Sequence, residues 1–264
     1  MKYSIITINY NNKDGLRKTI ESVINQTFKD FEYIIIDGGS TDGSVDVIKE
    51  NGDKIDYWVS EPDKGIYNAM NKGILQAQGE YLNFMNSGDC FYAIDVLESM
   101  CNYLGQDIVA GKFFFGDHKD PWGLEHDDIT FLDLYRKTLC HQATFIKSKL
   151  FTNNLYDEEL TIVSDWKFFI DKIIKENCSF RNTDIVVALY DSEGISAKQY
   201  EKSVAERNTI LRQFMYERVL NDYEKFINAS YCVHLLGQLS GSYRFQKLVC
   251  ILLNTLIKLK KFLK

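Results

Sequence analysis

The sequence has no excess of positive charge, no paired cysteine motif and no long uninterrupted apolar run. Asp and Glu (37) outnumber Lys and Arg (31), giving a net charge of −6, so nucleic acid is a poor candidate partner, although a local basic patch stays open. The six cysteines form no C-x-x-C pair, which argues against a disulfide scaffold and indicates buried thiols in a reducing compartment. The apolar run at the N-terminus breaks at Asn9 and is too short for a secretory signal. We therefore expect a cytoplasmic protein.

The chain does contain enough apolar material for a large α/β domain. It has 264 residues, 45% of them hydrophobic, which suits one large domain, alone or with an appendage. Runs rich in β-formers at 3–8, 31–37, 55–62 and 79–89 alternate with helical patterns at 16–24, from 45 and at 65–79. This alternation predicts a mainly parallel sheet flanked by helices. A helical pattern takes over in the C-terminal part.

Polar residues stand at the carboxyl ends of these four predicted strands, at 9–11, 37–40, 60–64 and 86–89. In an open parallel sheet the carboxyl ends of the strands lie at one edge, and ligands bind beyond that edge. The sequence therefore predicts a ligand site built from these four clusters.

Four ordered segments, IITINYN, IIIDGGSTDGS, SEPDKGIYNAMNKGI and GEYLNFMNSGD, resemble family 2 glycosyltransferases of the bacterial polysaccharide-biosynthesis type. A fainter likeness continues through HQATF, SDWKFF and EGIS, so that it covers about residues 1–200. The resemblance implies a GT-A (Rossmann-like) catalytic domain at 1–198, with a nucleotide-binding half at 1–90 and an acceptor half at 91–198. It leaves 199–264 as a helical C-terminal extension.

The resemblance also implies a nucleotide-sugar donor and names the residues that bind it. Asp37 matches an aspartate that contacts uracil in similar enzymes, which favours a UDP-sugar, although D-G-G-S alone would indicate an Asx turn. The family's arginine before Asn71 is Met70 here, which we expect in the core. Lys64 is a candidate cation for a phosphate, with a solvated surface lysine as the alternative. The predicted donor-binding residues are Thr7, Asn9, Tyr10, Asp37, Lys64, Asn71, Asn86 and Ser87.

The segment NSGD has fewer acidic residues than the family pattern. Asp89 matches the carboxylate that meets a divalent metal, whereas the earlier acidic positions are Asn86 and Gly88. Mn²⁺ or Mg²⁺ can be held by a single carboxylate when diphosphate oxygens and waters complete the coordination shell. We therefore predict a metal on Asp89, with weakened or lost metal affinity as the alternative.

The predicted catalytic base is Asp165, which precedes the apolar stripe of a helix in SDWKFF and matches the family's catalytic aspartate. A carboxylate at a helix N-terminus also has a purely structural explanation, because it interacts favourably with the helix dipole. His141, Gln142 and Trp166 are candidate contacts of donor or acceptor, although a lone histidine is usually a structural residue.

The final segment, residues 244–264, has an amphipathic and basic pattern. Its leucines recur on one face and Lys247, Lys258 and Lys261 on another, and its apolar run is too short and too interrupted to span a bilayer. This pattern predicts peripheral contact with an anionic membrane surface, on the inner face of the plasma membrane. Docking onto the catalytic domain or self-association is the alternative.

These features together predict an inverting, metal-dependent glycosyltransferase. It would move a hexosyl or N-acetylhexosaminyl group from a nucleotide-diphosphate donor to a glycan or polyprenyl-linked acceptor in cell-surface polysaccharide synthesis. The alternative is a scaffold that binds sugar nucleotides without turnover in a polysaccharide assembly complex. A nucleotidyltransferase is disfavoured, because IITINYNN lacks a Gly- and Arg-rich phosphate loop.

Overall fold

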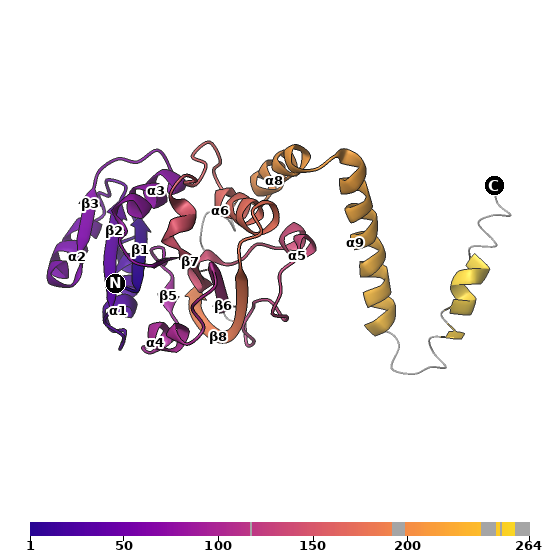
Figure 1. Ribbon diagram of the computed structural model, residues 1–264, viewed down its shortest axis with the longest axis horizontal. Helices are drawn as coiled ribbons and strands as arrows, with labels where there is room; N and C mark the ends of the chain where they lie inside the picture. Colours follow the sequence, from indigo (N-terminus) through magenta and orange to yellow (C-terminus); the bar gives the residue numbers. More distant parts are fainter. Residues whose placement is uncertain (117, 192–198, 239–246, 249, 257–264) are drawn as a thin grey trace. The chain divides into compact units, whose positions relative to one another are not determined.

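The computed structural model describes residues 1–116, 118–191, 199–238, 247–248 and 250–256 (Figure 1). The chain divides into two compact units, Met1–Arg207 and Asn208–Lys264. All predicted catalytic, donor and metal residues lie in the first unit. The predicted boundary at 198 falls at the end of the undescribed residues 192–198. The functional division of the chain therefore stays a prediction.

The first half of the larger unit alternates strands and helices as expected. Its elements are β1 (Tyr3–Asn9), α1 (Lys13–Ile24), β2 (Phe31–Asp37), α2 (Ser44–Glu50), the 3-10 turn η1 (Gly52–Lys54), β3 (Tyr57–Ser60), α3 (Ile66–Gln76) and β4 (Tyr81–Phe84). The strands are parallel in the order β3-β2-β1-β4. The predicted βαβ alternation is thus confirmed, and the carboxyl ends of the four strands share one edge.

The second half completes one eight-stranded sheet, with strand order β3-β2-β1-β4-β7-β6-β8-β5. Its elements are β5 (Cys90–Phe91), α4 (Val96–Cys101), β6 (Ile108–Phe115), α5 (Phe131–Arg136), η2 (His141–Ala143), β7 (Thr144–Lys147), η3 (Ser148–Phe151), α6 (Ser164–Phe169), η4 (Ile170–Lys175) and β8 (Phe180–Tyr190). Pairings of β7 with β4 and β6 and of β5 with β8 are antiparallel, and the other four are parallel. Helices flank this mainly parallel sheet, as predicted.

Two local details of the backbone bear on the site. His141 and Gln142 lie in the 3-10 turn η2, directly before the strand β7. The helix that begins at Ser164 changes to a π-helix at Ile170. The turn sets the two side chains off the regular alternation of a strand, so they face the polar edge.

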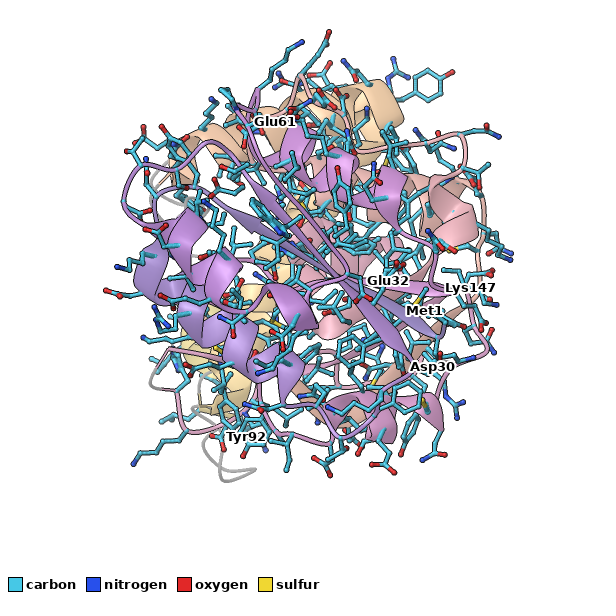
Figure 2. The ribbon with its side chains drawn as sticks, turned by 90° about the vertical axis from the view of Figure 1, so that its left-hand side faces the viewer. Met1, Asp30, Glu32, Glu61, Tyr92 and Lys147 are labelled. Carbon is cyan, nitrogen blue, oxygen red and sulfur yellow. The ribbon has the colours of Figure 1, made fainter. Side chains whose placement is uncertain are left out.

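The core fills the space between the sheet and its helices. Leu16, Ile20 and Val23 of α1 are fully buried, and so is Met70 of α3, as predicted. Figure 2 shows Met1, Asp30 and Glu32 at one end of the strands and Glu61 at the other, which is the end of the polar clusters. The expectation of buried thiols is wrong in part: four of the five cysteines with described side chains are half-buried, and Cys250 is exposed.

The second unit is helical where it is described. Helix α8 (Tyr200–Phe214) leads into it, and α9 (Glu217–Gln238) and a helical stretch within 247–256 follow. The motif EGIS (193–196) and most of the predicted basic end, including Phe245 and 257–264, lie outside the described residues. Among the described helices, none is long and apolar enough to cross a membrane.

Candidate active site

Asp37 forms the centre of the polar edge at the ends of β1, β2 and β3. The strand register places Asn9, Asp37 and Ser60 side by side. The Asp37 carboxylate accepts from Asn9 Nδ2 (2.7 Å), Ser60 Oγ (2.6 Å), Ser40 N (2.9 Å) and Ser40 Oγ (2.5 Å). Burial acts to raise the pKa of Asp37, but these hydrogen bonds outweigh it and hold the pKa below its ordinary value. Asp37 is therefore an ionised, rigidly held acceptor.

Tyr10 is the exposed member of this cluster. Its side chain is 66% exposed, and its ring lies against Gly38, where an added Cβ would stand 3.2 Å from Tyr10 Cδ2. An exposed aromatic ring beside a buried carboxylate can offer a stacking surface and a hydrogen-bond acceptor to the same planar base. Asn9, Tyr10 and Asp37 are thus brought together as predicted.

Three predicted donor residues are not brought to the same surface. Thr7 is fully buried, and its hydroxyl donates to Met85 O at 2.7 Å. Asn71 is also buried and binds the backbone of Tyr156 through both ends of its amide, each at 2.9 Å. Lys64 is exposed just before α3. The structure thus gives Thr7 and Asn71 packing contacts, and their role in donor binding stays a prediction.

Asp89 follows β4 and is buried, with its carboxylate held from two sides. Gln142 Nε2 donates to Oδ2 at 2.7 Å, and the backbone N–H of Asp191 donates to Oδ1 at 2.8 Å. Burial raises the pKa of Asp89 to about 6, although these two hydrogen bonds lower it, and the nearby charge of Asp191 raises it further. Asp89 is therefore a desolvated carboxylate held by two donors.

A carboxylate from another strand end lies beside Gly88, where the family pattern has an acidic residue. Gly88 has a φ of +106°, and a Cβ added there would stand 2.7 Å from Asp191 Oδ2. Asp191 comes directly after β8, so the fold brings a second carboxylate to the place where the family pattern has one at position 88. Ser87 donates to Asn12 O at 3.2 Å and so closes the loop against α1.

Asp165 joins a hydrogen-bonded chain that crosses the site. His141 Nδ1 lies 2.9 Å from Asp165 Oδ2, and His141 Nε2 lies 3.0 Å from Asn86 Nδ2. If the Asn86 amide donates, the imidazole accepts at Nε2 and donates from Nδ1 to the carboxylate. Tyr67 Oη donates to Asp165 Oδ1 at 3.0 Å, which ties α3 to α6 (Figure 1).

The surroundings of Asp165 keep it ionised. Burial acts to raise the pKa of Asp165, but the hydrogen bonds from His141 and Tyr67 outweigh it and hold the pKa below its ordinary value. An ionised carboxylate that is 8% exposed can accept a proton from a hydroxyl brought to its open side. Trp166, in contrast, is buried and donates to Leu134 O at 2.7 Å, so the structure gives it packing contacts, and its role as a donor or acceptor contact stays a prediction.

Sequence reasoning missed Tyr67 and Asp191. Tyr67 lies in the quoted segment GIYNAMNKG, but only the packing of α3 on α6 shows that it reaches Asp165. Asp191 had a usable signal, because it is the acid that ends a β-rich run, as Asp37 and Asp89 do. Within the described residues, no group of three or more His, Cys, Asp or Glu side chains is arranged to hold a metal.

Comparisons with known proteins agree with this architecture. Residues 4–177 match the family model described as glycosyl transferase family 2. An uncharacterized glycosyltransferase of Mycobacterium tuberculosis is 32% identical over 217 residues, which cover 76% of this chain and 79% of the relative. A PGL/p-HBAD biosynthesis glycosyltransferase of Mycobacterium bovis is 31% identical over 203 residues, covering 73% and 77%.

Solved structures extend the likeness to the fold. S. aureus TarS 1-349 in complex with UDP-GlcNAc has a TM-score of 0.64 at 20% identity, covering 75% of this chain and 61% of that one. A mannosyltransferase from Pyrobaculum calidifontis in complex with GDP-Man and Mn²⁺ has a TM-score of 0.56 at 15% identity, covering 72% and 56%. This chain thus spans less than two thirds of either solved chain. The chain belongs to glycosyl transferase family 2, and its larger unit has the GT-A fold.

Proposed function

We propose that the protein is an inverting glycosyltransferase that moves a hexosyl or N-acetylhexosaminyl group from a UDP-sugar to a glycan or lipid-linked acceptor in cell-surface polysaccharide synthesis. The observation that carries the proposal is the chain Asn86–His141–Asp165, which holds an ionised carboxylate beside the edge where Asp37 and Tyr10 lie. A scaffold without turnover would have no need for a buried, hydrogen-bonded carboxylate of this kind.

In the proposed reaction, Asp165 takes the proton from an acceptor hydroxyl as its oxygen attacks the anomeric carbon. The bond from that carbon to the diphosphate breaks, the nucleotide diphosphate leaves, and the configuration inverts. His141 and Tyr67 orient the carboxylate through the hydrogen bonds given above, while Asp37 and Tyr10 bind the base. Asp37 matches the aspartate that contacts uracil in similar enzymes, and this match supports a UDP-sugar as donor.

The oxygen donors near Gly88 fit a hard divalent cation. Two carboxylates, those of Asp89 and Asp191, lie in this region; burial raises the pKa of Asp89, and the charge of Asp191 adds to this rise. Asp89 would hold Mn²⁺ or Mg²⁺, which prefer such oxygens, with Gln142 orienting its carboxylate. When bound, the ion would supply positive charge to the leaving diphosphate.

We expect the effect of Mn²⁺ on thermal stability to increase as the pH rises through about 6. A carboxylate binds metal only when it is ionised, and Asp89 ionises near pH 6. In the metal-free protein the pH dependence of stability has the opposite sign. The pKa of Asp89 in the folded protein exceeds its ordinary value of 3.8. Protonated Asp89 therefore contributes stability at low pH, and this contribution is lost as the pH rises from about 4 to about 6.

Thermal unfolding of wild type and Asp89→Asn, with and without Mn²⁺, at pH 5 to 8 checks this. The variant should lose both pH-dependent effects, and the surface change Asp171→Asn should keep them. Identical Mn²⁺ shifts in wild type and Asp89→Asn would rule out Asp89 as the metal ligand.

The acceptor part of the proposal draws on the relatives and on the C-terminal segment. The relative from M. bovis is described as acting in PGL/p-HBAD biosynthesis, which is consistent with a glycan or lipid-linked acceptor. Among the described residues at 247–256, Leu248, Ile251, Leu252 and Leu256 are each more than half exposed. We propose that this apolar side of the segment rests on the inner face of the plasma membrane, close to a lipid-linked acceptor.

A donor panel tests the proposed function directly. The intact chain is incubated with UDP-, GDP- and TDP-sugars, with and without Mn²⁺, and release of nucleoside diphosphate is measured. We expect hydrolysis of at least one UDP-sugar, increased by Mn²⁺. Binding of UDP-sugars without release of UDP, also in the presence of candidate acceptors, would favour the scaffold instead.

A further inference from the structure

Arg207 is a cation near the predicted base, and its buried Nε has no hydrogen-bond partner among the described residues. It lies on α8, and its guanidinium carbon is 4.7 Å from the centre of the Trp166 ring. The side chain is half-buried, so its guanidinium is partly removed from water.

The position of Arg207 is fixed by its neighbours. The carboxylate of Glu206 accepts from the backbone N–H groups of Thr161 (2.9 Å) and Ile162 (3.0 Å). These two residues come shortly before Asp165, so this turn of α8 is fastened to the segment that leads into α6. Arg207 is thus held against the face of a buried ring and does not move as a free surface side chain would.

The surroundings of Arg207 make its positive charge energetically unfavourable. Burial lowers the pKa of Arg207, and the nearby charge of Asp165 acts to raise it, but an arginine stays protonated at any physiological pH. The Asp165 oxygens accept from His141, Tyr67 and Trp166 N, and among the described residues no hydrogen bond joins Asp165 to the guanidinium. A partly desolvated cation whose Nε has no partner among the described residues costs free energy, and an oxyanion that meets its planar fork would relieve that cost.

We propose that Arg207 binds an anionic group of the acceptor, a phosphate or a carboxylate, next to the hydroxyl that Asp165 deprotonates. This inference rests on the proposed function, because the assignment to the acceptor follows from the role of Asp165. In an inverting displacement the diphosphate leaves from the face opposite to the attacking oxygen. An anion bound on the side of the base therefore belongs to the acceptor and not to the donor.

The electrostatics of the base favour an anionic acceptor over a neutral one. A positive charge beside Asp165 lowers its affinity for a proton, which weakens it as a base. An acceptor anion bound to Arg207 offsets that charge when the hydroxyl is in place. The acceptor thus completes the site in the same step in which it binds.

Three hexoses that differ in charge test the proposal: glucose 6-phosphate, glucuronate and glucose. Each is titrated by calorimetry into the intact chain, into Arg207→Gln, and into Arg212→Gln, which removes an exposed arginine of the same helix. We expect at least one of the anionic sugars to bind wild type and Arg212→Gln about 10- to 100-fold more tightly than Arg207→Gln. Glucose should not distinguish the three proteins, and Arg207→Lys should be intermediate.

Titration of UDP-GlcNAc into the same proteins separates the possible results. Equal binding of the anionic sugars by wild type and Arg207→Gln, or no binding by wild type, overturns the proposal. A loss of UDP-GlcNAc binding in Arg207→Gln alone would assign the guanidinium to the donor diphosphate and also overturn it. If no nucleotide sugar binds wild type, the proposed function is wrong. Binding of the anionic sugars that depends on Arg207 would then still show an anion site at this residue. Thermal unfolding verifies that each variant is folded.

Discussion

Replacing Asp165 by Asn should lower the rate of sugar transfer by about 10²- to 10⁴-fold, the range that a positioned general base contributes. The change keeps the shape of the side chain, and its Oδ1 can still accept from Tyr67 and from the backbone N–H of Trp166. It removes the negative charge and the capacity to accept a proton. Donor binding should stay within about twofold, because the Asp37 cluster is untouched.

The hydrogen-bonded chain makes the loss larger than charge alone would. His141 Nδ1 faces Asp165 Oδ2 at 2.9 Å, and an amide nitrogen in that position would present a donor to a donor. The imidazole must then change its tautomer, which places an N–H at Nε2 against Asn86 Nδ2. The disturbance is passed along the chain to the residue that ends β4.

Initial rates and donor affinity, measured side by side, decide the role of Asp165. Asp171→Asn is the matched control, because Asp171 forms an (i,i+4) ion pair with Lys175 on the same helical segment at 2.5 Å, and such surface pairs contribute at most about 1 kcal/mol. The control should keep full activity. Transfer by Asp165→Asn at the wild-type rate would show that another group takes the proton.

The first half of the fold could be predicted from the sequence because its signals are local. Each strand there is a short β-rich run, each helix has an apolar stripe, and parallel pairing follows from their alternation. The carboxyl ends of such strands meet by construction, so Asn9, Asp37 and Asp89 could be assigned to one edge without coordinates. Met70 could be assigned to the core from its spacing alone.

The remaining contacts of the site join segments that are far apart in the chain, and residue spacing in a single sequence does not predict such contacts. Tyr67 and Asp165 are 98 positions apart, and Asp89 and Asp191 are 102 apart. The antiparallel return of β7 beside β4 decides that Gln142 meets Asp89, and no periodicity signals that return. Thr7 shows the converse case: a family motif marks its position, the pleat of β1 buries its side chain, and its role in donor binding stays a prediction.

Placing an aspartate at Gly88, which would restore the family's acidic tract, should damage this protein. A side chain at a φ of +106° is strained by about 1–3 kcal/mol, and its Cβ would stand 2.7 Å from Asp191 Oδ2. A third carboxylate would also join Asp89 and Asp191. We expect Gly88→Asp to lower Tm by roughly 3–10 °C and to reduce transfer at least about tenfold, because the Asp191 N–H that orients Asp89 would be displaced.

Three further variants separate the effect of backbone strain at position 88 from the effect of the contact with Asp191. Gly105 has a φ of +134° and no neighbour within 4 Å of an added Cβ, so Gly105→Ala measures backbone strain alone, and Gly88→Ala should lower Tm more. Adding Asp191→Ala to Gly88→Asp removes the collision and one charge but leaves the strain, so it should restore part of the lost stability. If Gly88→Asp is instead as stable as wild type and more active, the prediction is wrong, and the site can use an acidic side chain at position 88. If the prediction holds, the second acid of the site comes from the end of β8, and a glycine at 88 is the condition for it to fit.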